Sequence, residues 1–300
     1  MNFRKYYFTH IVVFLLFVSN VLLANETLSA SSPRSKNAPQ IPSLNSNFGI
    51  KVLPSSKADS GTMIVFHGYG GNRNFVDNLR QETVITDQLV GFNFPDHDIG
   101  GARSIPVNQI KYGTIQELLP AFSVLKKYIL DEKNLSIHLY GFSAGGGAVV
   151  SVIAILNQTR FDVDLASIGI RKKEKTSLLK AIQNGYVILD CPLKSMDEIL
   201  SSRESTPELE AIATQYRKNA LNPIDSLKHF KGLRLRVLVN FQVPDDVLSN
   251  RDDSIFIERL RRYNQGYTQI NFGKDGGHND RHSSLWKAYS TFKSHPLHQK

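Results

Sequence analysis

Short apolar runs alternate with helix-forming segments along most of the chain, and this alternation constrains the fold more than any other feature. Residues 63–66 form a run without a polar side chain, as expected for a strand that is buried on both faces. Similar runs recur at residues 89–94, 135–140, 186–189, 234–241 and 267–272. Strands that alternate with helices need crossover connections, so the sequence predicts an α/β fold: a mostly parallel sheet with helices on both faces.

Helical periodicity fills the intervals between these runs. Apolar residues at three- and four-residue spacing predict a helix over residues 115–129, and a second helix is expected over residues 254–263. Parallel sheets carry their chemistry in the loops at the carboxyl ends of the strands. Functional residues are therefore expected in the loops that follow the apolar runs.

The first 24 residues have the order of a secretory signal peptide. Arg4, Lys5 and His10 precede the apolar run 11–18, and Ala24 is a small residue before a polar segment. A membrane-spanning helix needs about 20 apolar residues, and this stretch is shorter. Cleavage after Ala24, or at a second site after residue 30, predicts a secreted or exported protein; an uncleaved membrane anchor is the alternative.

The rest of the chain divides into a linker, one domain and a short tail. Residues 25–48 are rich in Ser, Asn and Pro and cannot bury enough apolar surface to fold, which predicts a flexible linker. Residues 49–293 have the size of a single α/β domain, and residues 294–300 form a tail. Residues 194–231 are more than one crossover needs, which predicts a small lid insertion.

Composition and charge exclude several classes of protein. The chain has one cysteine, Cys191, which excludes an internal disulfide framework and any metal site built from several cysteines. The net charge of +9 is scattered, which argues against a nucleic-acid partner. The charged segment 171–175 is predicted to lie on the surface, where peripheral contact with an anionic membrane is an alternative role. The adjacent residues 96–98 are expected to form a solvated loop beside the pocket rather than a metal site.

A nucleophile motif follows the third of the long apolar runs. Residues 141–145 match G-x-S-x-G around Ser143, directly after the strand predicted at 135–140 and before a helix-forming run at 146–156. The tight strand-to-helix turn requires small residues beside the serine and exposes its hydroxyl. Ser143 is therefore the candidate nucleophile, and a Gly-rich packing turn is the alternative interpretation.

A serine hydroxyl needs a base, and a histidine after a late strand is expected to supply it. His278 lies in a Gly-Gly-His-Asn loop directly after the last apolar run, which makes it the candidate base; His282 is its close rival. His67-Gly68-Tyr69-Gly70-Gly71 follows the first run, and its glycines allow amides to point at an oxyanion. The predicted donors are the backbone amides of Tyr69 and Ala144.

The acid that orients the base has four candidates after the run 234–241. They are Asp245, Asp246, Asp252 and Asp253. Asp252 and Asp253 directly precede the helix predicted at 254–263, where capping and the helix dipole already explain an acidic residue. Asp245 and Asp246 remain as candidates for the acid.

Taken together, these motifs resemble the α/β-hydrolase superfamily over residues 62–293. Within it, Asn222-Pro223-Ile224-Asp225 and the segment around His278 are similar to single-domain, membrane-associated serine hydrolases. The resemblance implies ester, thioester or amide hydrolysis without a cofactor. Asp245-Asp246-Val247-Leu248 resembles a pattern in which the first aspartate is catalytic, which implies a Ser143, Asp245, His278 triad.

The predicted function is a serine hydrolase that cleaves an ester or thioester through an acyl-enzyme intermediate. Its expected partner is a small-molecule or lipid-like acyl substrate. A serine peptidase and a non-catalytic binding protein on the same fold are the alternatives.

Overall fold

The computed structural model describes residues 49–295, apart from residues 59, 70, 83, 95–114, 203–206, 220 and 281. These residues contain a seven-stranded sheet in the order β1-β3-β2-β4-β5-β6-β7, in which β1 is antiparallel and the other pairs are parallel. The strands are β1 (Lys51–Leu53), β2 (Thr62–Phe66), β3 (Gln88–Gly91), β4 (Ile137–Phe142), β5 (Val187–Asp190), β6 (Val237–Gln242) and β7 (Thr268–Gly273). The predicted fold class is confirmed.

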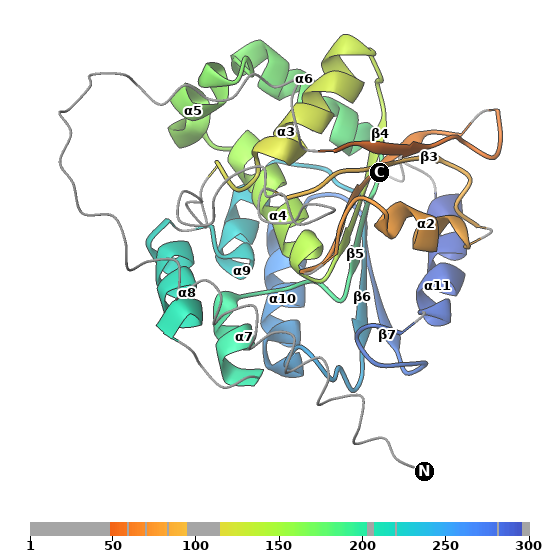
Figure 1. The fold of residues 1–300 in the computed structure, drawn as a ribbon, viewed down its shortest axis with the longest axis vertical. Helices are drawn as coiled ribbons and strands as arrows, with labels where there is room; N and C mark the ends of the chain where they lie inside the picture. Colours follow the sequence, from red (N-terminus) through yellow and green to blue (C-terminus); the bar gives the residue numbers. More distant parts are fainter. Residues whose placement is uncertain are drawn as a thin grey trace, which may run out of the picture. The chain divides into compact units, whose positions relative to one another are not determined.

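Helices cover both faces of the sheet (Figure 1). Helices α2 (Phe75–Arg80) and α11 (Ser283–Ser294) pack on one face. The other face is covered by α3 (Leu119–Leu125), α4 (Ala144–Leu156), α6 (Lys172–Asn184) and α10 (Asp253–Tyr263). Among the helices of the described residues, none combines the length and the apolar composition that a membrane span requires.

Alternation along the strands builds the two cores. In β6, Val237, Val239 and Phe241 face the core under α4 and α10, whereas Leu238 faces the core under α11. Both sets are buried, because a parallel strand between two helical layers has no solvent-exposed face. The apolar runs in the sequence follow directly from this double burial.

Several predicted boundaries differ from those in the structure. The predicted strand 135–140 begins at Ile137 and continues through Phe142, because Leu135 is exposed and the burial begins two residues later. The predicted strand 89–94 ends at Gly91, and the antiparallel edge strand β1 was not predicted. The helix expected over 115–129 starts at Leu119 and ends in a π-helical turn, Lys126–Asp131.

The predicted insertion 194–231 contains α7 (Met196–Ser202), α8 (Pro207–Asn219), α9 (Pro223–Ser226) and a 3₁₀ turn, Leu227–Phe230. Met196 of α7 and Ala213 of α8 pack with Leu193 and Leu248, next to Ala144. This segment therefore lies against both the G-x-S-x-G turn and the loop after β6.

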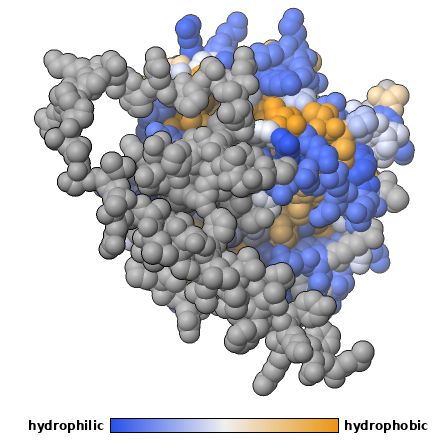
Figure 2. Space-filling view, viewed as in Figure 1, coloured by the Kyte–Doolittle hydropathy of each residue, from blue (hydrophilic) through white to orange (hydrophobic). Residues whose placement is uncertain are grey.

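The charged segment at the start of α6 is mostly on the surface. Arg171, Lys172 and Lys173 are exposed, and Figure 2 shows hydrophilic side chains over the end of the domain where α5 (Asp162–Ser167) and α6 lie. Lys175 differs from its neighbours: it is buried, donates to the carbonyl of Gln158 at 2.8 Å and pairs with Asp162. Its charge is therefore not available to an external partner.

Some of the predicted segments lie outside the described residues. These are the signal segment 1–24, the whole linker 25–48, residues 96–98 and residues 296–300 of the tail.

Candidate active site

The register of the sheet brings the loops that follow β4, β5, β6 and β7 to one edge. Phe142 of β4 pairs with Asp190 of β5, Asp190 pairs with Asn240 of β6, and Asn240 pairs with Asn271 of β7. The residues that follow these positions therefore leave the sheet side by side. The loops after these four strands are far apart in sequence but begin next to one another at the edge of the sheet.

Ser143 occupies the turn between β4 and α4. Its backbone φ of 53° and ψ of −120° lie in a region that residues with a side chain rarely adopt. A Cβ on Gly141 would lie 2.6 Å from the carbonyl oxygen of Gly145, and a Cβ on Gly145 would overlap the backbone of Phe66. Both glycines are therefore required by close approach of the backbone, and the turn is the one that the motif predicts.

His278 follows β7 and reaches Ser143 with its ring. The distance from His278 Nε2 to Ser143 Oγ is 2.8 Å, and the histidine is 2% exposed. The other ring nitrogen, Nδ1, lies 2.9 Å from Asp245 Oδ2. A carboxylate only accepts, so Nδ1 carries the proton and Nε2 is left to accept the hydrogen of the serine hydroxyl.

Asp245 lies in the loop after β6 and is held by that loop. Its Oδ1 accepts the backbone N–H groups of Val247 at 2.9 Å and Leu248 at 2.7 Å. Burial opposes the ionisation of Asp245, but the hydrogen bonds from His278 and from these two amides outweigh it and lower the pKa of this carboxyl. The carboxylate is therefore charged and fixed in direction when it meets the imidazole.

The other three acid candidates have different partners. Asp246 Oδ1 accepts the backbone N–H of His278 at 2.6 Å, so it contacts the histidine loop and not the ring. Asp252 is the N-cap of α10 and accepts a hydrogen bond from Ser195 Oγ at 3.2 Å. Asp253 forms an ion pair with the buried Lys194 at 2.7 Å. The side chain of Asp252 forms no capping hydrogen bond, so of the two roles predicted for these acids only the interaction with the helix dipole fits their position at the start of α10.

The predicted oxyanion donors, the amides of Tyr69 and Ala144, belong to two segments that lie beside the serine. Ala144 is the first residue of α4, and amides in the first turn of a helix have no acceptor within the helix. Tyr69 follows β2 in the loop that begins at His67. A Cβ on Gly68 would lie 3.2 Å from Ser143 Cβ, so the backbone just before Tyr69 runs beside the serine. The tyrosine side chain is 69% exposed.

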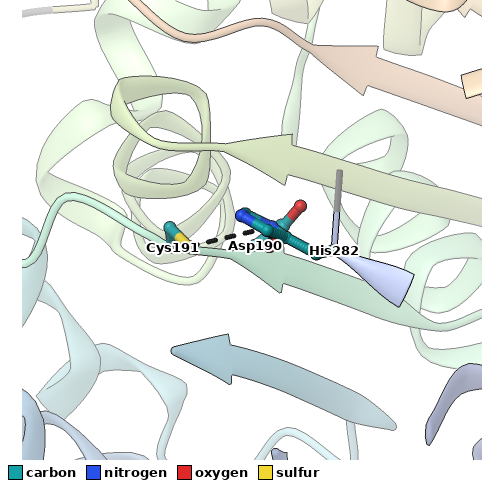
Figure 3. A group of neighbouring side chains, drawn as sticks. All are labelled: Asp190, Cys191 and His282. Atoms are coloured by element: carbon teal, nitrogen blue, oxygen red, sulfur yellow. Dashed lines mark hydrogen bonds and ion pairs between the residues drawn. The ribbon is translucent and has the colours of Figure 1, made fainter. Parts of the chain in front are cut away.

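His282, the rival base, has other partners. Its Nδ1 lies 2.8 Å from Asp190 Oδ1 and its Nε2 lies 3.0 Å from the carbonyl oxygen of Gly277. Figure 3 shows the ring with Asp190 and Cys191 at the end of β5. The structure thus brings His278, and not His282, to Ser143.

Cysteine, aspartate and histidine are common metal ligands, and among the described residues two sets of these side chains have ligand atoms within 4.8 Å of one another. They are Asp190, Cys191, His282 and Cys191, Asp245, His278. In both, the carboxylate and the imidazole already face each other at hydrogen-bond distance. Burial raises the pKa of the Cys191 thiol, which disfavours the thiolate that a metal requires. These residues are better explained by hydrogen bonding to one another.

The sequence analysis missed two groups of residues around this site. Asp190 carried no motif, and its role depends on a histidine 92 positions away. Lys194 pairs with Glu198 at 2.5 Å and with Asp253, and burial raises the pKa of Glu198 to about 7. The four-residue spacing of Lys194 and Glu198 is a signal in the sequence that could have revealed their ion pair. The contact of Lys194 with Asp253 has no such signal, because the two residues are far apart in sequence.

The arrangement of Ser143, His278 and Asp245 can support nucleophilic chemistry. A hydroxyl that donates to an imidazole can lose its proton as the oxygen forms a bond to an electrophile. The carboxylate on the other side of the ring stabilises the imidazolium that results.

Comparisons with known proteins place the fold but not the function. No family model and no curated protein sequence matches the chain. The solved structures that are similar include esterase B from Lactobacillus rhamnosis, with 16% identity and a TM-score of 0.56 over 82% of this chain and 80% of that chain. A carboxylesterase from Lactobacillus plantarum WCFS1 has 15% identity and a TM-score of 0.53 over 77% and 78%.

A third similar structure is an acylaminoacyl peptidase, with 14% identity and a TM-score of 0.55. It matches over 83% of this chain but only 39% of that chain. With these neighbours and the sheet order described above, the chain has the α/β-hydrolase fold.

Proposed function

We propose that this protein is a serine hydrolase that cleaves an ester or a thioester through an acyl-enzyme intermediate. One observation carries the proposal: His278 Nε2 lies 2.8 Å from Ser143 Oγ while His278 Nδ1 lies 2.9 Å from Asp245. Each group is held by a different loop of the sheet. The strained backbone at Ser143 adds support, because strain of this kind is found where a side chain must be presented for chemistry.

In the first half of the reaction, Ser143 Oγ attacks the carbonyl carbon of the substrate and His278 Nε2 takes the hydroxyl proton. The backbone amides of Tyr69 and Ala144 donate to the oxyanion of the tetrahedral intermediate. The imidazolium then gives its proton to the leaving oxygen or sulfur as the bond to the acyl carbon breaks. Asp245 keeps the ring in the tautomer that this transfer requires.

In the second half, water attacks the acyl carbon of the acyl-enzyme and His278 takes a proton from the water. As the second tetrahedral intermediate collapses, the bond from Ser143 Oγ to the acyl carbon breaks, the imidazolium returns its proton to Ser143 Oγ, and the acid is released. All proton transfers use side chains of the protein, so the cycle needs no cofactor.

The segment 194–231 is proposed to form a lid and one wall of the acyl site. Its apolar residues Met196 and Ala213 lie in the cluster that borders Ala144. An apolar wall beside the residue that follows the nucleophile favours the acyl chain of a small-molecule or lipid-like substrate. Export from the cell is proposed from the N-terminal sequence, and peripheral contact with a membrane is proposed from the charged segment 171–175.

A serine peptidase is the second candidate, because an acylaminoacyl peptidase is among the similar structures. This chain matches 39% of that protein's length, and peptide selectivity commonly depends on additional domains or charged pockets. The match therefore supports the shared fold more than a shared substrate. A non-catalytic binding protein would have no need for the hydrogen-bonded order of Ser143, His278 and Asp245.

Labelling of the purified protein with a fluorophosphonate probe tests the proposal, because such probes react with activated serines. Labelling of the parent and its loss in Ser143→Ala are the expected results. p-Nitrophenyl esters of increasing chain length, beside a thioester and a peptide amide, then separate the candidate substrates. A parent protein that neither reacts with the probe nor hydrolyses any of these compounds would overturn the proposal in favour of a binding protein.

A further inference from the structure

His282 lies just after the proposed base and is buried at the start of α11. It is the N-cap residue of that helix and is 3% exposed. Two polar contacts hold its ring: Nδ1 to Asp190 Oδ1 at 2.8 Å and Nε2 to the carbonyl oxygen of Gly277 at 3.0 Å (Figure 3 shows the first pair). The mechanism proposed above uses neither the ring nor Asp190.

The two contacts define the protonation state of the ring. A backbone carbonyl oxygen only accepts hydrogen bonds, so Nε2 must carry a proton. Asp190 also accepts from Tyr140 Oη at 2.7 Å and from Asn240 Nδ2 at 2.8 Å, which is the pattern of an ionised carboxylate. Nδ1 therefore carries a proton as well, and His282 is an imidazolium.

The groups around the ring agree with this assignment. Burial opposes the charge, but the hydrogen bond and the coulombic attraction of Asp190, the Gly277 carbonyl and Asp275 outweigh it and raise the pKa of His282 to about 9. Cys191 Sγ lies 4.0 Å away and is a neutral thiol. The Tyr140 phenol faces Asp190, and burial raises the pKa of that phenol, so it stays neutral too.

One peptide unit links this ion pair to the proposed base. The carbonyl oxygen of the Gly277–His278 peptide binds His282, and the N–H of the same peptide binds Asp246 Oδ1 at 2.6 Å. On the other side of Gly277, its own N–H binds Asp280 Oδ2 at 2.6 Å. Because a peptide unit is planar, fixing its oxygen and its hydrogen fixes the position of the His278 Cα, from which the side chain extends toward Ser143.

We propose that His282 is a positioning residue that acts as a permanent imidazolium: paired with Asp190, it donates to the Gly277 carbonyl and thereby orients His278 toward Ser143. This inference rests on the proposed function, since it assigns His282 a role in the same site. Asp246 and His282 then hold one peptide from opposite sides with opposite charges. The rate of the chemical step depends on this orientation, whereas binding of the substrate does not.

The first experiment measures the charge state without using activity. The full-length protein is labelled with ¹⁵N-histidine, and the ring nitrogens are observed by NMR at about pH 7.5. Both nitrogens of His282 are expected to be protonated. His138 is the matched control: it is buried beside Asp87, but burial lowers its pKa to about 4, so one of its nitrogens is expected to be bare. A bare nitrogen on His282 would overturn the proposal.

The second experiment measures the rate. His282→Gln keeps a polar side chain but removes the charge and replaces the two donor nitrogens of the ring with one amide nitrogen, and His138→Gln is the control on the opposite end of the sheet. In His282→Gln, kcat is expected to fall roughly 10- to 100-fold with KM within about twofold of the parent, because a small misalignment slows chemistry without weakening binding. His138→Gln is expected to keep the parent kcat. An unchanged kcat in His282→Gln would contradict the positioning role.

If His282→Gln does not fold, Asp190→Asn decides the question, because asparagine preserves the shape of the aspartate and removes its charge. A lower kcat with unchanged KM, and a His282 ring that loses a proton at about pH 7.5, are expected; an unchanged kcat overturns the proposal. A failure of the proposed function looks different. In that case the parent protein shows no turnover and no labelling of Ser143, while the NMR spectrum still reports the charge of His282.

Discussion

Two histidine–aspartate pairs lie at the same edge of the sheet and differ in what the second ring nitrogen meets. In both, Nδ1 faces a carboxylate, at 2.9 Å in His278–Asp245 and at 2.8 Å in His282–Asp190. Nε2 of His278 meets a hydroxyl, whereas Nε2 of His282 meets a carbonyl oxygen. A hydroxyl can donate to a bare nitrogen and a carbonyl cannot, so only His278 can act as a base.

The comparison shows that the carboxylate alone does not make a histidine a base. In both pairs the aspartate accepts a hydrogen bond from Nδ1, which places a proton on that nitrogen. The partner of Nε2 makes the difference. A hydroxyl partner leaves Nε2 free to accept a proton, whereas a carbonyl partner requires Nε2 to keep its proton.

Removal of the hydroxyl should have the largest effect. Ser143→Ala removes the group that distinguishes the surroundings of His278 from those of His282, and turnover is expected to fall on the order of a million-fold, as in other serine triads. Fluorophosphonate labelling should disappear while the circular dichroism spectrum stays that of the parent. Labelling that persists in this variant would identify a different serine as the nucleophile.

Neutralising the acid of the proposed triad should have the next largest effect. Asp245→Asn can no longer accept from Nδ1–H, so the ring adopts the wrong tautomer and kcat is expected to fall by roughly 10⁴. Steady-state kinetics with an ester substrate measure the loss, and thermal unfolding shows whether folding is preserved. A loss of less than about tenfold would mean that His278 does not depend on Asp245.

The neighbouring acid should matter much less. Asp246→Asn keeps an oxygen that can accept the backbone N–H of His278, which Asp246 binds at 2.6 Å. Its kcat is therefore expected to remain within about tenfold of the parent. The same kinetic assay compares the two variants directly, and a severe loss in Asp246→Asn beside a mild one in Asp245→Asn would reverse the assignment.

The smallest effect concerns stability and arises from His282. The pKa of His282 in the folded protein is raised to about 9, above its ordinary value of 6.5, so its contribution to stability is fully present below pH 6.5 and is lost as the pH rises through 9. Calorimetry at several pH values should show that the Tm of the parent falls by roughly 5 °C more over this range than that of His282→Gln. Parallel curves for the two proteins would argue against a charged ring.

Much of the fold could be predicted because strands buried on both faces leave uninterrupted apolar runs. Each of the six runs coincides with a strand of the parallel part of the sheet, although the ends shift by up to three residues. β1 escaped prediction because it is three residues long and half-exposed at the edge of the sheet. Its position depends on pairing with β3, which no local pattern reports.

The site divides in the same way. The G-x-S-x-G pattern is local in sequence, although only Gly141 is required by a contact within the turn, whereas Gly145 is required by the backbone of Phe66 in β2. The structure brings His278 and Asp245 to Ser143. No sequence pattern predicts the hydrogen bond between His282 and Asp190, or the one from the His278 backbone N–H to Asp246. The catalytic roles and the N-terminal signal peptide remain predictions.

The α/β class of the fold, the turn at Ser143 and the loops that hold its partners could be predicted from the sequence, because apolar runs, helical periodicity and the G-x-S-x-G spacing are local patterns. The pairing of each aspartate with its histidine is seen only in the tertiary structure. Asp245 contacts His278 and Asp190 contacts His282, and both histidines follow β7. The physical reason is that a hydrogen bond forms between atoms that the register of the sheet brings together. The alignment of β4, β5, β6 and β7 places His278 and His282, which are four residues apart, next to different partners of Nε2: the Ser143 hydroxyl for His278 and the Gly277 carbonyl for His282.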